Sequence, residues 1–482
     1  MIKIIKKTRD RYSNLPVGVK AAMWFTFCSF LQQAISLLTT PVFTRLMTTD
    51  EYGVWTVYGS WRSTLGVFIT LQLAAGGFGK AMLKFKNRYA YVSSMICLTF
   101  VSVGAWSVVL FLGRNVFPEL LELRLPYLFS MLVSLFFQQV FSLWAGKQRF
   151  EYQYKRLVAI TAIATVLTPM FSIVAIQAGA NTVDARVYGQ AIVNAVCYGG
   201  IMIVILVKGR CFYNREYWKY SFPFGLAMIP HYLANSVLSS SDRIMIGQMV
   251  GSTESALYNI GYSIANIMVL FLTSVLSAFS PWMMIRIDQK NFQNVKYITN
   301  MLGVCFCTLS LLPILAGPEV ISILATHEYS QSVWVIPPVA GSIYFIYIHN
   351  LFSCVQFFYE KKTFIVVASC SAAAVNVLLN YIFIGLFGYV AAAYTTLFCY
   401  MALSVVDFIF LQKIRKKYEI EDKIYDYKML FLLSIVVVMI SVGGNLLYLN
   451  RVVRYALLAA VLIIMIVKRK QIISLYKRLK ER

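Results

Sequence analysis

The stretch Ala456-Leu457-Leu458-Ala459-Ala460-Val461-Leu462-Ile463-Ile464-Met465-Ile466-Val467 is an unbroken run of apolar residues. A second run extends from Ile435 to Ile440, and long apolar segments recur along the whole chain. An α-helix needs roughly 20 mostly apolar residues to cross a bilayer, whereas a transmembrane β-strand alternates apolar and polar residues over about ten positions. The unbroken runs therefore predict membrane-spanning helices and not a β-barrel.

The composition agrees with a membrane protein. Of the 482 residues, 59% are hydrophobic and only 13% are charged, whereas a soluble domain has about 25% charged residues. We predict an all-α integral membrane protein with about 14 transmembrane helices. The predicted spans are 21–44, 54–78, 91–112, 126–145, 157–178, 187–207, 222–247, 256–282, 297–315, 333–357, 364–386, 390–412, 429–447 and 452–467.

The basic residues follow the alternation of the loops. The net charge is +24, and 36 of the 44 Lys and Arg residues lie in the two terminal segments and in every second loop. The other eight are all arginines: Arg45, Arg62, Arg114, Arg124, Arg186, Arg243, Arg451 and Arg454. Cytoplasmic loops of membrane proteins carry such an excess of positive charge. The pattern predicts that both termini are cytoplasmic, that the number of spans is even, and that nucleic acid is not a partner.

Spans 1–6 and spans 7–12 resemble two copies of one unit, with a weak trace of similarity after the first span of each copy. Six spans per copy give parallel repeats, an organisation used by transporters. We predict an N-terminal lobe over 1–210, a C-terminal lobe over 211–415, and two additional spans with a basic cytoplasmic tail over 416–482. Two six-helix lobes around a central cavity form an alternating-access architecture.

Polar side chains recur at helical spacing in the first two spans of each predicted lobe. These residues are Gln33, Ser36, Thr40 and Thr44; Tyr58, Arg62 and Gln72; His231, Asn235, Ser239 and Asp242; and Asn259, Tyr262, Asn266 and Thr273. Polar groups are costly against lipid, so they usually face the interior of the bundle. They predict either a hydrophilic cavity or hydrogen bonds that only hold the helices together.

Two arginines within spans are the sharpest candidates for a binding site. Arg62 lies about 12 Å into its span at 1.5 Å per residue, and Arg243 lies in the outer half of span 7 beside Asp242. Guanidinium groups suit phosphate or carboxylate ligands. The alternative is that Arg62 pairs with Asp242 as a bridge between lobes. Arg45, at the end of span 1, is either a third ligand residue or a snorkelling side chain.

Motifs for other activities are absent from the sequence. It contains no P-loop, no zinc-protease motif and no acidic pair in an outer loop that would suit an enzyme. Eight of the nine cysteines lie in predicted spans and the ninth, Cys211, lies in a loop, without metal-binding spacing. We therefore expect no catalytic residues, no metal and no cofactor, and coupling to a proton or sodium gradient stays open.

Three segments resemble bacterial polysaccharide transporters of the O-antigen flippase type. They are Thr39-Thr40-Pro41-Val42-Phe43-Thr44-Arg45-Leu46-Met47-Thr48-Thr49-Asp50-Glu51-Tyr52-Gly53, then Phe222–Leu226 with Ser241–Gly247, and Asn376–Tyr381 with Phe387–Ala393. This family belongs to the multidrug, oligosaccharidyl-lipid and polysaccharide exporter superfamily, together with multidrug extruders and lipid II flippases. Many members of this family are interpreted as having twelve spans. The fourteen spans predicted here are similar in number to those of lipid II flippases.

The resemblance implies a flippase that moves a polyprenyl-pyrophosphate-linked oligosaccharide from the inner to the outer leaflet of the bacterial inner membrane. The oligosaccharide would be an O-antigen (lipopolysaccharide) or a capsular or exopolysaccharide repeat unit, and the partners would be membrane lipids and other polysaccharide-assembly proteins. Arg62 and Arg243 would neutralise the pyrophosphate, and Tyr58 and Tyr262 would face the sugars. The alternatives are a cation-coupled extruder of drugs or small solutes, and a membrane-embedded assembly enzyme such as a polymerase.

Overall fold

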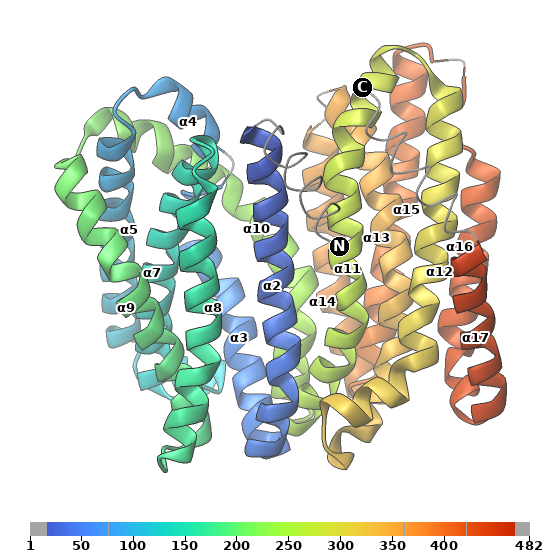
Figure 1. Cartoon of the computed structure of the whole chain (residues 1–482), viewed down its shortest axis with the longest axis horizontal. Coiled ribbons are helices and arrows are strands. Elements are labelled where there is room, and N and C mark those ends of the chain that lie inside the picture. The colour runs from blue at the N-terminus through green and yellow to red at the C-terminus, as the bar shows by residue number, and fades with distance from the viewer. Residues whose placement is uncertain (1–16, 76, 360–361, 421, 468–482) are drawn as a thin grey trace, which may run out of the picture. The chain divides into compact units, whose positions relative to one another are not determined.

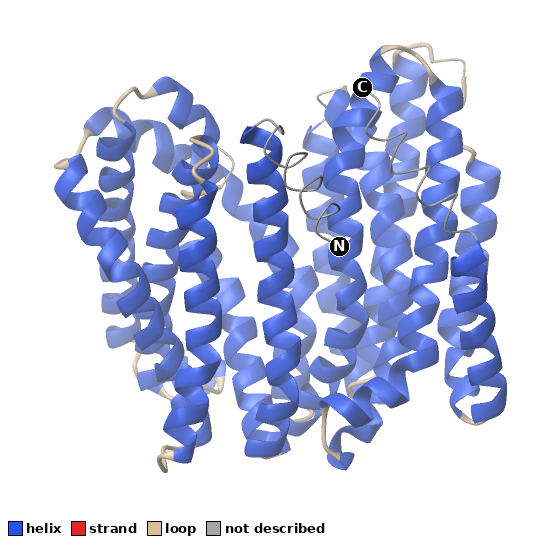
Figure 2. Cartoon of the chain, in the orientation of Figure 1, coloured by secondary structure: helices blue, strands red, loops and turns tan. Residues whose placement is uncertain are grey.

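The computed structural model describes residues 17–75, 77–359, 362–420 and 422–467. All regular secondary structure in these ranges is helical (Figures 1 and 2). The chain divides into two compact units, Met1–Leu233 and Ala234–Arg482, which we call unit 1 and unit 2. The boundary between them falls inside helix α10. The predicted lobes, and the separate segment from 416 onward, stay predictions.

Unit 1 is a bundle in which α7 packs against α5 and α9, and α8 packs against α2 and α9. Its core contains Tyr91, Met95, Val140, Leu143 and Ile205. The helices of this unit are α2 (Val17–Leu46), α3 (Thr49–Ile69), α4 (Phe78–Lys84), α5 (Arg88–Leu112), α6 (Phe117–Leu121), α7 (Leu125–Phe150), α8 (Tyr154–Gln177), α9 (Thr182–Gly209) and the first part of α10 (Arg215–Met249).

Unit 2 is built around α13, which packs against α11, α12, α15 and α16. Most residues of α13 are buried, so this helix is surrounded by protein rather than by lipid. The elements that follow α10 are α11 (Ser252–Asp288), α12 (Phe292–Leu324), the 3₁₀ helix η1 (His327–Val335), α13 (Ile336–Phe358), α14 (Lys362–Phe387), α15 (Ala391–Lys417), α16 (Tyr427–Gly443), the 3₁₀ helix η2 (Gly444–Tyr448) and α17 (Arg451–Val467).

Polar side chains define where several helices begin. Thr48 and Glu51 form a reciprocal capping box at the start of α3, which satisfies backbone N–H groups that the first helical turn leaves unpaired. Asn181 caps α9 by accepting hydrogen bonds from the N–H groups of Val183 (3.1 Å) and Asp184 (3.2 Å). Asp426 does the same at α16, where the N–H of Met429 donates to it over 3.2 Å.

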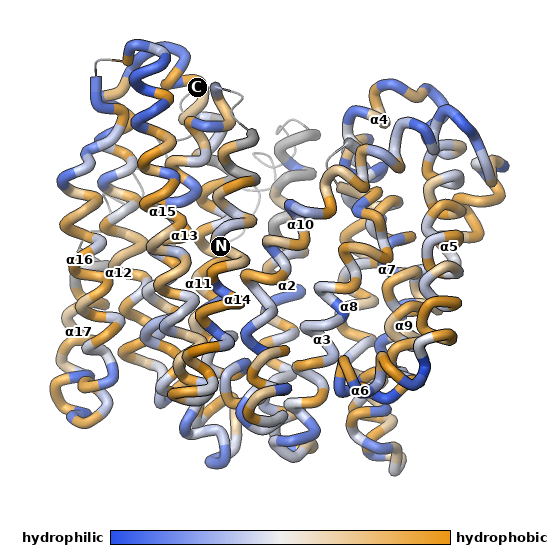
Figure 3. Tube along the Cα trace, turned by 180° about the vertical axis from the view of Figure 1, so that it is seen from behind, coloured by the Kyte–Doolittle hydropathy of each residue, from blue (hydrophilic) through white to orange (hydrophobic). Residues whose placement is uncertain are grey.

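Ten helices in the described ranges are long and apolar enough to cross a membrane. Hydrophobic residues occupy much of the length of the helices, whereas hydrophilic residues concentrate at the helix ends and in the connections (Figure 3). Helices α2, α3, α10 and α17 do not meet the same criterion. The first three carry most of the predicted polar residues, and α17 has only 17 described residues. Each of the fourteen predicted spans overlaps a helix, but the count of fourteen stays a prediction.

One expected helix boundary is wrong. The second predicted span runs to residue 78, but α3 ends at Ile69, and Leu71 and Gln72 both have positive φ (50° and 48°). Gln72 therefore lies in a turn and not on the polar face of this helix. The backbone of α10 closely approaches this turn, because a Cβ on Gly225 would meet the carbonyl oxygen of Leu71 at 2.3 Å.

A proline pair lies at the start of a helix. Pro337 and Pro338 occupy the first turn of α13, directly after η1. Proline is tolerated there because the N–H groups of the first turn have no intrahelical partner.

Candidate functional site

Unit 2 contains a fully buried carboxylate. Asp242 on α10 is 1% exposed. Its Oδ2 accepts hydrogen bonds from the hydroxyl groups of Tyr258 (2.6 Å) and Thr396 (2.9 Å), and its Oδ1 accepts one from Nδ2 of Asn380 (2.6 Å). A buried ionised carboxylate is costly unless neighbouring groups satisfy it. Three donors on its two oxygens satisfy Asp242 inside this unit.

The partners of Asp242 come from three further helices and bond to one another. Asn376 and Asn380 lie one turn apart on α14, and Nδ2 of Asn380 donates to Oδ1 of Asn376 over 3.3 Å. Oδ1 of Asn376 also accepts from the Ser241 hydroxyl (3.1 Å), and the Thr395 hydroxyl donates to Oδ1 of Asn380. We call Ser241, Asp242, Tyr258, Asn376, Asn380, Thr395 and Thr396 the Asp242 cluster.

Sequence reasoning found Asp242 but missed the asparagines and threonines around it. Asn376 and Asn380 lie four residues apart in an otherwise apolar segment, and that spacing places both side chains on one helix face. This signal was available in the sequence. The segment enters the sequence prediction only through its family resemblance, and no role is predicted for the two asparagines.

Arg243 reaches the cluster through a pair of aromatic rings. Its guanidinium carbon lies 4.3 Å from the centroid of the Tyr262 ring, and that ring stacks on Tyr258 at 5.9 Å and 28°. One guanidinium nitrogen also donates to the carbonyl oxygen of Ser239 over 3.0 Å. Contact with the face of an aromatic ring is favourable for a cation. Asp242 and Arg243 are adjacent in the sequence and contact the same pair of stacked tyrosines. Asp242 accepts a hydrogen bond from Tyr258, and Arg243 contacts the ring of Tyr262.

Arg62 has a comparable aromatic setting in unit 1. Tyr58, one turn earlier on α3, is fully buried, and its ring stacks on Trp55 at 5.6 Å and 26°. Nη2 of Arg62 donates to Oε1 of Gln138 on α7. The Nε atoms of Arg62 and Arg243 are both buried and make no hydrogen bond with any described residue. Each arginine therefore keeps one donor that protein atoms cover and that has no described acceptor.

The other predicted site residues are placed one by one. Gln33 and Arg45 are exposed on α2, and Arg45 donates to the carbonyl oxygen of Pro41 over 2.8 Å. His231 lies edge-on to Tyr232, with ring centroids 5.4 Å apart. Asn235 is exposed on α10, and Asn266 is half-buried on α11. Among the described contacts, Gln33, Arg45 and Asn266 do not join the groups around Asp242 or Arg62.

A second buried carboxylate lies elsewhere in unit 2. Asp407 on α15 is fully buried, and its Oδ2 lies 2.5 Å from Nδ1 of His349 on α13. Its Oδ1 accepts a hydrogen bond from Nε2 of Gln356 over 2.9 Å. This pair fixes α13 against α15, and it provides a natural comparison for Asp242.

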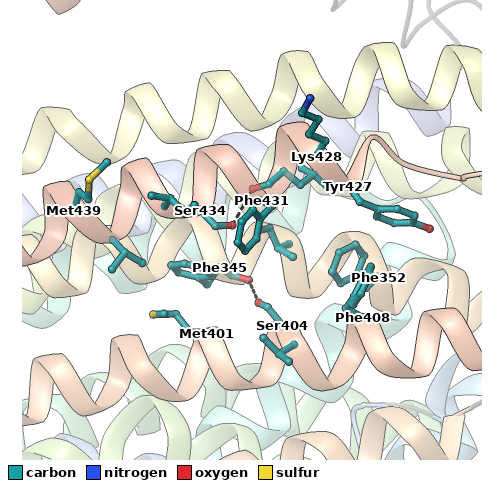
Figure 4. Close-up of a pocket in the computed structure, with 15 residues that line it drawn as sticks. Phe345, Phe352, Met401, Ser404, Phe408, Tyr427, Lys428, Phe431, Ser434 and Met439 are labelled. Carbon is teal, nitrogen blue, oxygen red and sulfur yellow. Dashed lines mark hydrogen bonds between the residues drawn. The ribbon is translucent and has the colours of Figure 1, made fainter.

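An apolar groove runs along α13, α15 and α16, with a volume of about 710 Å³ (Figure 4). Phe345, Phe352, Phe408 and Phe431 line it, and Lys428 lies at one end. The hydroxyl group of Ser404 donates to the Phe345 carbonyl oxygen over 3.0 Å, so it offers the groove no free donor. Such a lining suits hydrocarbon chains and not a polar substrate.

Comparisons with known proteins identify the fold. The structure is similar to that of the lipid II flippase MurJ in an inward closed conformation, with a TM-score of 0.67 and 12% identity over 94% of this chain and 100% of that chain. It is similar to an inward-facing multidrug resistance MATE family transporter of the MOP superfamily, with a TM-score of 0.63 and 12% identity over 81% of this chain and 96% of that chain.

A third similar structure is a MOP superfamily transporter from Pyrococcus furiosus, with a TM-score of 0.56 and 14% identity over 82% of this chain and 95% of that chain. That protein is described as having a binding pocket of reverse polarity, which suggests a different function for it. At these identities the likeness shows the fold alone. None of the curated proteins matches the chain.

A family model described as "Polysaccharide biosynthesis protein" matches residues 19–285, which is more than half of the sequence. The match begins in α2 and ends in α11, so it includes every helix that carries a predicted site residue. With its membrane-spanning helices and its transporter fold, the protein is a multi-pass membrane protein. It belongs to the polysaccharide biosynthesis protein family.

Proposed function

We propose that this protein is a flippase, which moves a polyprenyl-pyrophosphate-linked oligosaccharide from the inner to the outer leaflet by alternating access. The observation that carries the proposal is a combination: a member of a polysaccharide biosynthesis family has, over 94% of its length, the fold of a lipid II flippase. A polysaccharide that is assembled outside the cytoplasm requires its intermediates to cross a membrane. A transporter fold supplies that step without requiring bond formation.

The pyrophosphate of this substrate would be bound by Arg62 and Arg243. Both are half-buried within helices, and both keep a buried Nε without a described acceptor. Guanidinium groups are suited to phosphate because they present several donors in one plane. The neighbouring rings of Tyr58 and Tyr262 would contact the sugars. We propose the bacterial inner membrane as the location, an O-antigen, capsular or exopolysaccharide repeat unit as the cargo, and other polysaccharide-assembly proteins as partners.

Leaflet exchange in proteoliposomes tests this function. A fluorescent polyprenyl-pyrophosphate oligosaccharide is reconstituted with the native protein, with an Arg62→Ala/Arg243→Ala variant, and with an Arg114→Ala/Arg451→Ala control. The control also removes one arginine from each unit, but both of its arginines are exposed.

We expect fast exchange by the native protein and the control. Exchange by the first variant should be at least about tenfold slower, because each lost charge-assisted hydrogen bond costs about 1.5–3 kcal/mol. Equal loss in both variants would reject the arginine site and keep the function. No exchange by folded native protein, with several glycans tried, would favour the extruder or the polymerase.

We also propose that the Asp242 cluster couples transport to a proton or sodium gradient. A carboxylate surrounded by hydroxyl and amide groups can bind a proton or a small cation, since hard cations prefer oxygen ligands. An imposed gradient should accelerate exchange by the native protein and by Asp407→Asn, but not by Asp242→Asn. Gradient dependence retained in Asp242→Asn would remove this role from the cluster.

A further inference from the structure

Gln138 is an exposed polar residue near the middle of α7. The helix has 26 residues, so roughly 18–20 Å of helix lies on either side of Gln138 at 1.5 Å per residue. A polar side chain at this depth is costly against lipid, and it usually faces protein or a polar cavity. The groups that Gln138 contacts therefore indicate what it does.

The side chain of Gln138 bonds to Arg62 on α3, a helix that packs against α7 within unit 1 (Figure 1). Nη2 of Arg62 donates to Oε1 of Gln138. Because a guanidinium group can only donate, the oxygen of the amide must face it, and the NH2 group is left for other acceptors. The bond also fixes the plane of the guanidinium, in which all of its donors lie. Gln138 thus orients Arg62.

Two donor groups of this pair have no acceptor among the described residues. Nη1 of Arg62 makes no described hydrogen bond and, unlike Nε, is not fully covered by protein. The NH2 group of Gln138 also has no described acceptor, and its side chain is exposed. Phosphate oxygens are strong acceptors for such donors. The pair can therefore bind an anion without breaking the hydrogen bond between its two members.

The charge of Arg62 is not neutralised by a carboxylate within the described parts of the chain, because none of the described salt bridges includes it. Its side chain bonds to a neutral amide instead. A charged group within a membrane span is costly and is usually paired. Glutamine at position 138 orients the guanidinium and leaves its positive charge for a ligand, whereas glutamate at the same position would neutralise it.

The face of α3 beside Arg62 leaves room for a ligand. Gly59 and Ser63 are small and exposed, and their spacing places them on the same face of the helix as Arg62. A Cβ added at Gly59 would meet no atom within 4 Å. The space next to the guanidinium group is therefore open on the side of this glycine.

We propose that Gln138 makes the arginine site of unit 1 selective for anions, because it orients Arg62 without neutralising it and donates to the same phosphate group. The inference rests on the proposed function and deepens it, since Arg62 is one of the two residues proposed to bind pyrophosphate. A cationic head group would be repelled by the guanidinium. An uncharged head group would gain much less from the two donors, because hydrogen bonds between charged partners are stronger.

Binding to the purified, full-length protein in detergent tests this proposal without requiring transport. Calorimetric titrations compare geranyl pyrophosphate with geraniol, which has the same hydrocarbon chain and no charge. We expect the native protein to bind the pyrophosphate at least about tenfold more tightly than the alcohol. The ratio of the two affinities measures the selectivity of the site for an anion.

Two substitutions of Gln138 separate charge from structure. Gln138→Glu keeps an acceptor for Arg62 but neutralises it, so the affinity for geranyl pyrophosphate should fall at least about tenfold, without a lower unfolding temperature. Gln138→Met loses the hydrogen bond and leaves the charge, so this affinity should fall about threefold and the unfolding temperature should decrease. A purely structural role predicts the opposite order of affinities, because glutamate preserves the bond that methionine loses.

Gln289→Glu is the matched control. Oε1 of Gln289 accepts a hydrogen bond from Nη1 of Arg286 over 2.8 Å at the end of α11. The substitution therefore adds a carboxylate to a similar pair of side chains elsewhere in the chain. It should leave the affinities for geranyl pyrophosphate and for geraniol unchanged.

Three results would overturn the proposal. They are a smaller loss of affinity in Gln138→Glu than in Gln138→Met, an equal loss in Gln289→Glu, and no preference of the folded native protein for the pyrophosphate. If Gln138→Glu does not fold, unchanged selectivity in Gln138→Met would overturn it as well. Leaflet exchange separates these failures from failure of the flippase. Exchange by native protein with any of these results would reject the role of Gln138 alone, and selective binding without exchange would reject the flippase alone.

Discussion

The surroundings of Asp242 in unit 2 and of Arg186 in unit 1 hold charged groups among helices in different ways. Around Asp242, three protein donors bond to the carboxylate, and the asparagines and threonines around it bond to one another. Around Arg186, the rings of Phe43 and Trp55 contact the guanidinium group, and Nη1 donates to Sδ of Met47 over 3.8 Å. Hydrogen bonds stabilise the charge in the first region, whereas contacts with ring faces contribute in the second. The two regions should therefore differ in how much they contribute to stability.

The largest expected difference is in stability. Asp242→Ala leaves the donors of Tyr258, Asn380 and Thr396 without their acceptor, and we expect the free energy of unfolding to fall by at least about 3 kcal/mol. Arg186→Gln loses contacts with ring faces and should cost about 0.5–2 kcal/mol. Unfolding of both variants by a denaturing detergent measures the difference. Equal costs would mean that contacts with ring faces stabilise Arg186 as strongly as hydrogen bonds stabilise Asp242.

A smaller effect on stability distinguishes a hydrogen bond to the Asp242 carboxylate from a buried hydrogen bond to a neutral acceptor. Tyr258→Phe removes one donor to a carboxylate and should cost about 1.5–3 kcal/mol. Tyr344→Phe is the matched control, because that fully buried hydroxyl donates to the neutral carbonyl oxygen of Leu430 over 3.1 Å. It should cost about 0.5–1.5 kcal/mol. Thermal unfolding in detergent measures the stability cost of each variant. A larger cost for Tyr344→Phe than for Tyr258→Phe would mean that Asp242 is not ionised.

The smallest effect concerns a carboxylate outside the membrane-spanning segments. The N–H of Met429 donates to Asp426, and with help from Asn300 it holds the pKa of this carboxyl below its ordinary value of 3.8. At pH values above the ordinary pKa, the ionised carboxylate of Asp426 stabilises α16. This contribution is lost as the pH falls through the lower pKa of the folded state. Asp426→Ala should cost about 1 kcal/mol at neutral pH.

At a pH below the folded-state pKa, the cost of Asp426→Ala should become smaller. Asn181→Ala removes a cap of similar geometry that does not titrate, so its cost should be the same at both pH values. Thermal unfolding at two pH values measures both variants. An equally pH-dependent cost for Asn181→Ala would assign the change to other groups.

The positions of the helices were largely predictable, because long apolar segments leave few other structures possible in a membrane. The end of α3 was not, since the residues just after Ile69 are mostly apolar or small. The left-handed positions Leu71 and Gln72 are not glycines, so the sequence gives no turn signal there.

The candidate sites were predictable only in part. Asp242 and Arg243 stood out as charges in an apolar segment, but two of the three partners that satisfy Asp242 come from α14 and α15, more than 130 residues away. Arg186 lies just before the predicted span 187–207. The Asn181 cap instead starts α9 at Thr182, so Arg186 belongs to a helix and faces a pocket.

The length of α11 has a consequence for the choice of lipid. Its 37 residues extend for about 55 Å at 1.5 Å per residue, whereas the hydrocarbon core of a bilayer is about 30 Å thick. Such a helix tilts, kinks or projects from the membrane, and each adjustment changes with bilayer thickness. Hydrophobic mismatch thus acts directly on the helix that carries Tyr258 and Tyr262. Acyl-chain length is therefore a variable to control in every reconstitution of this protein.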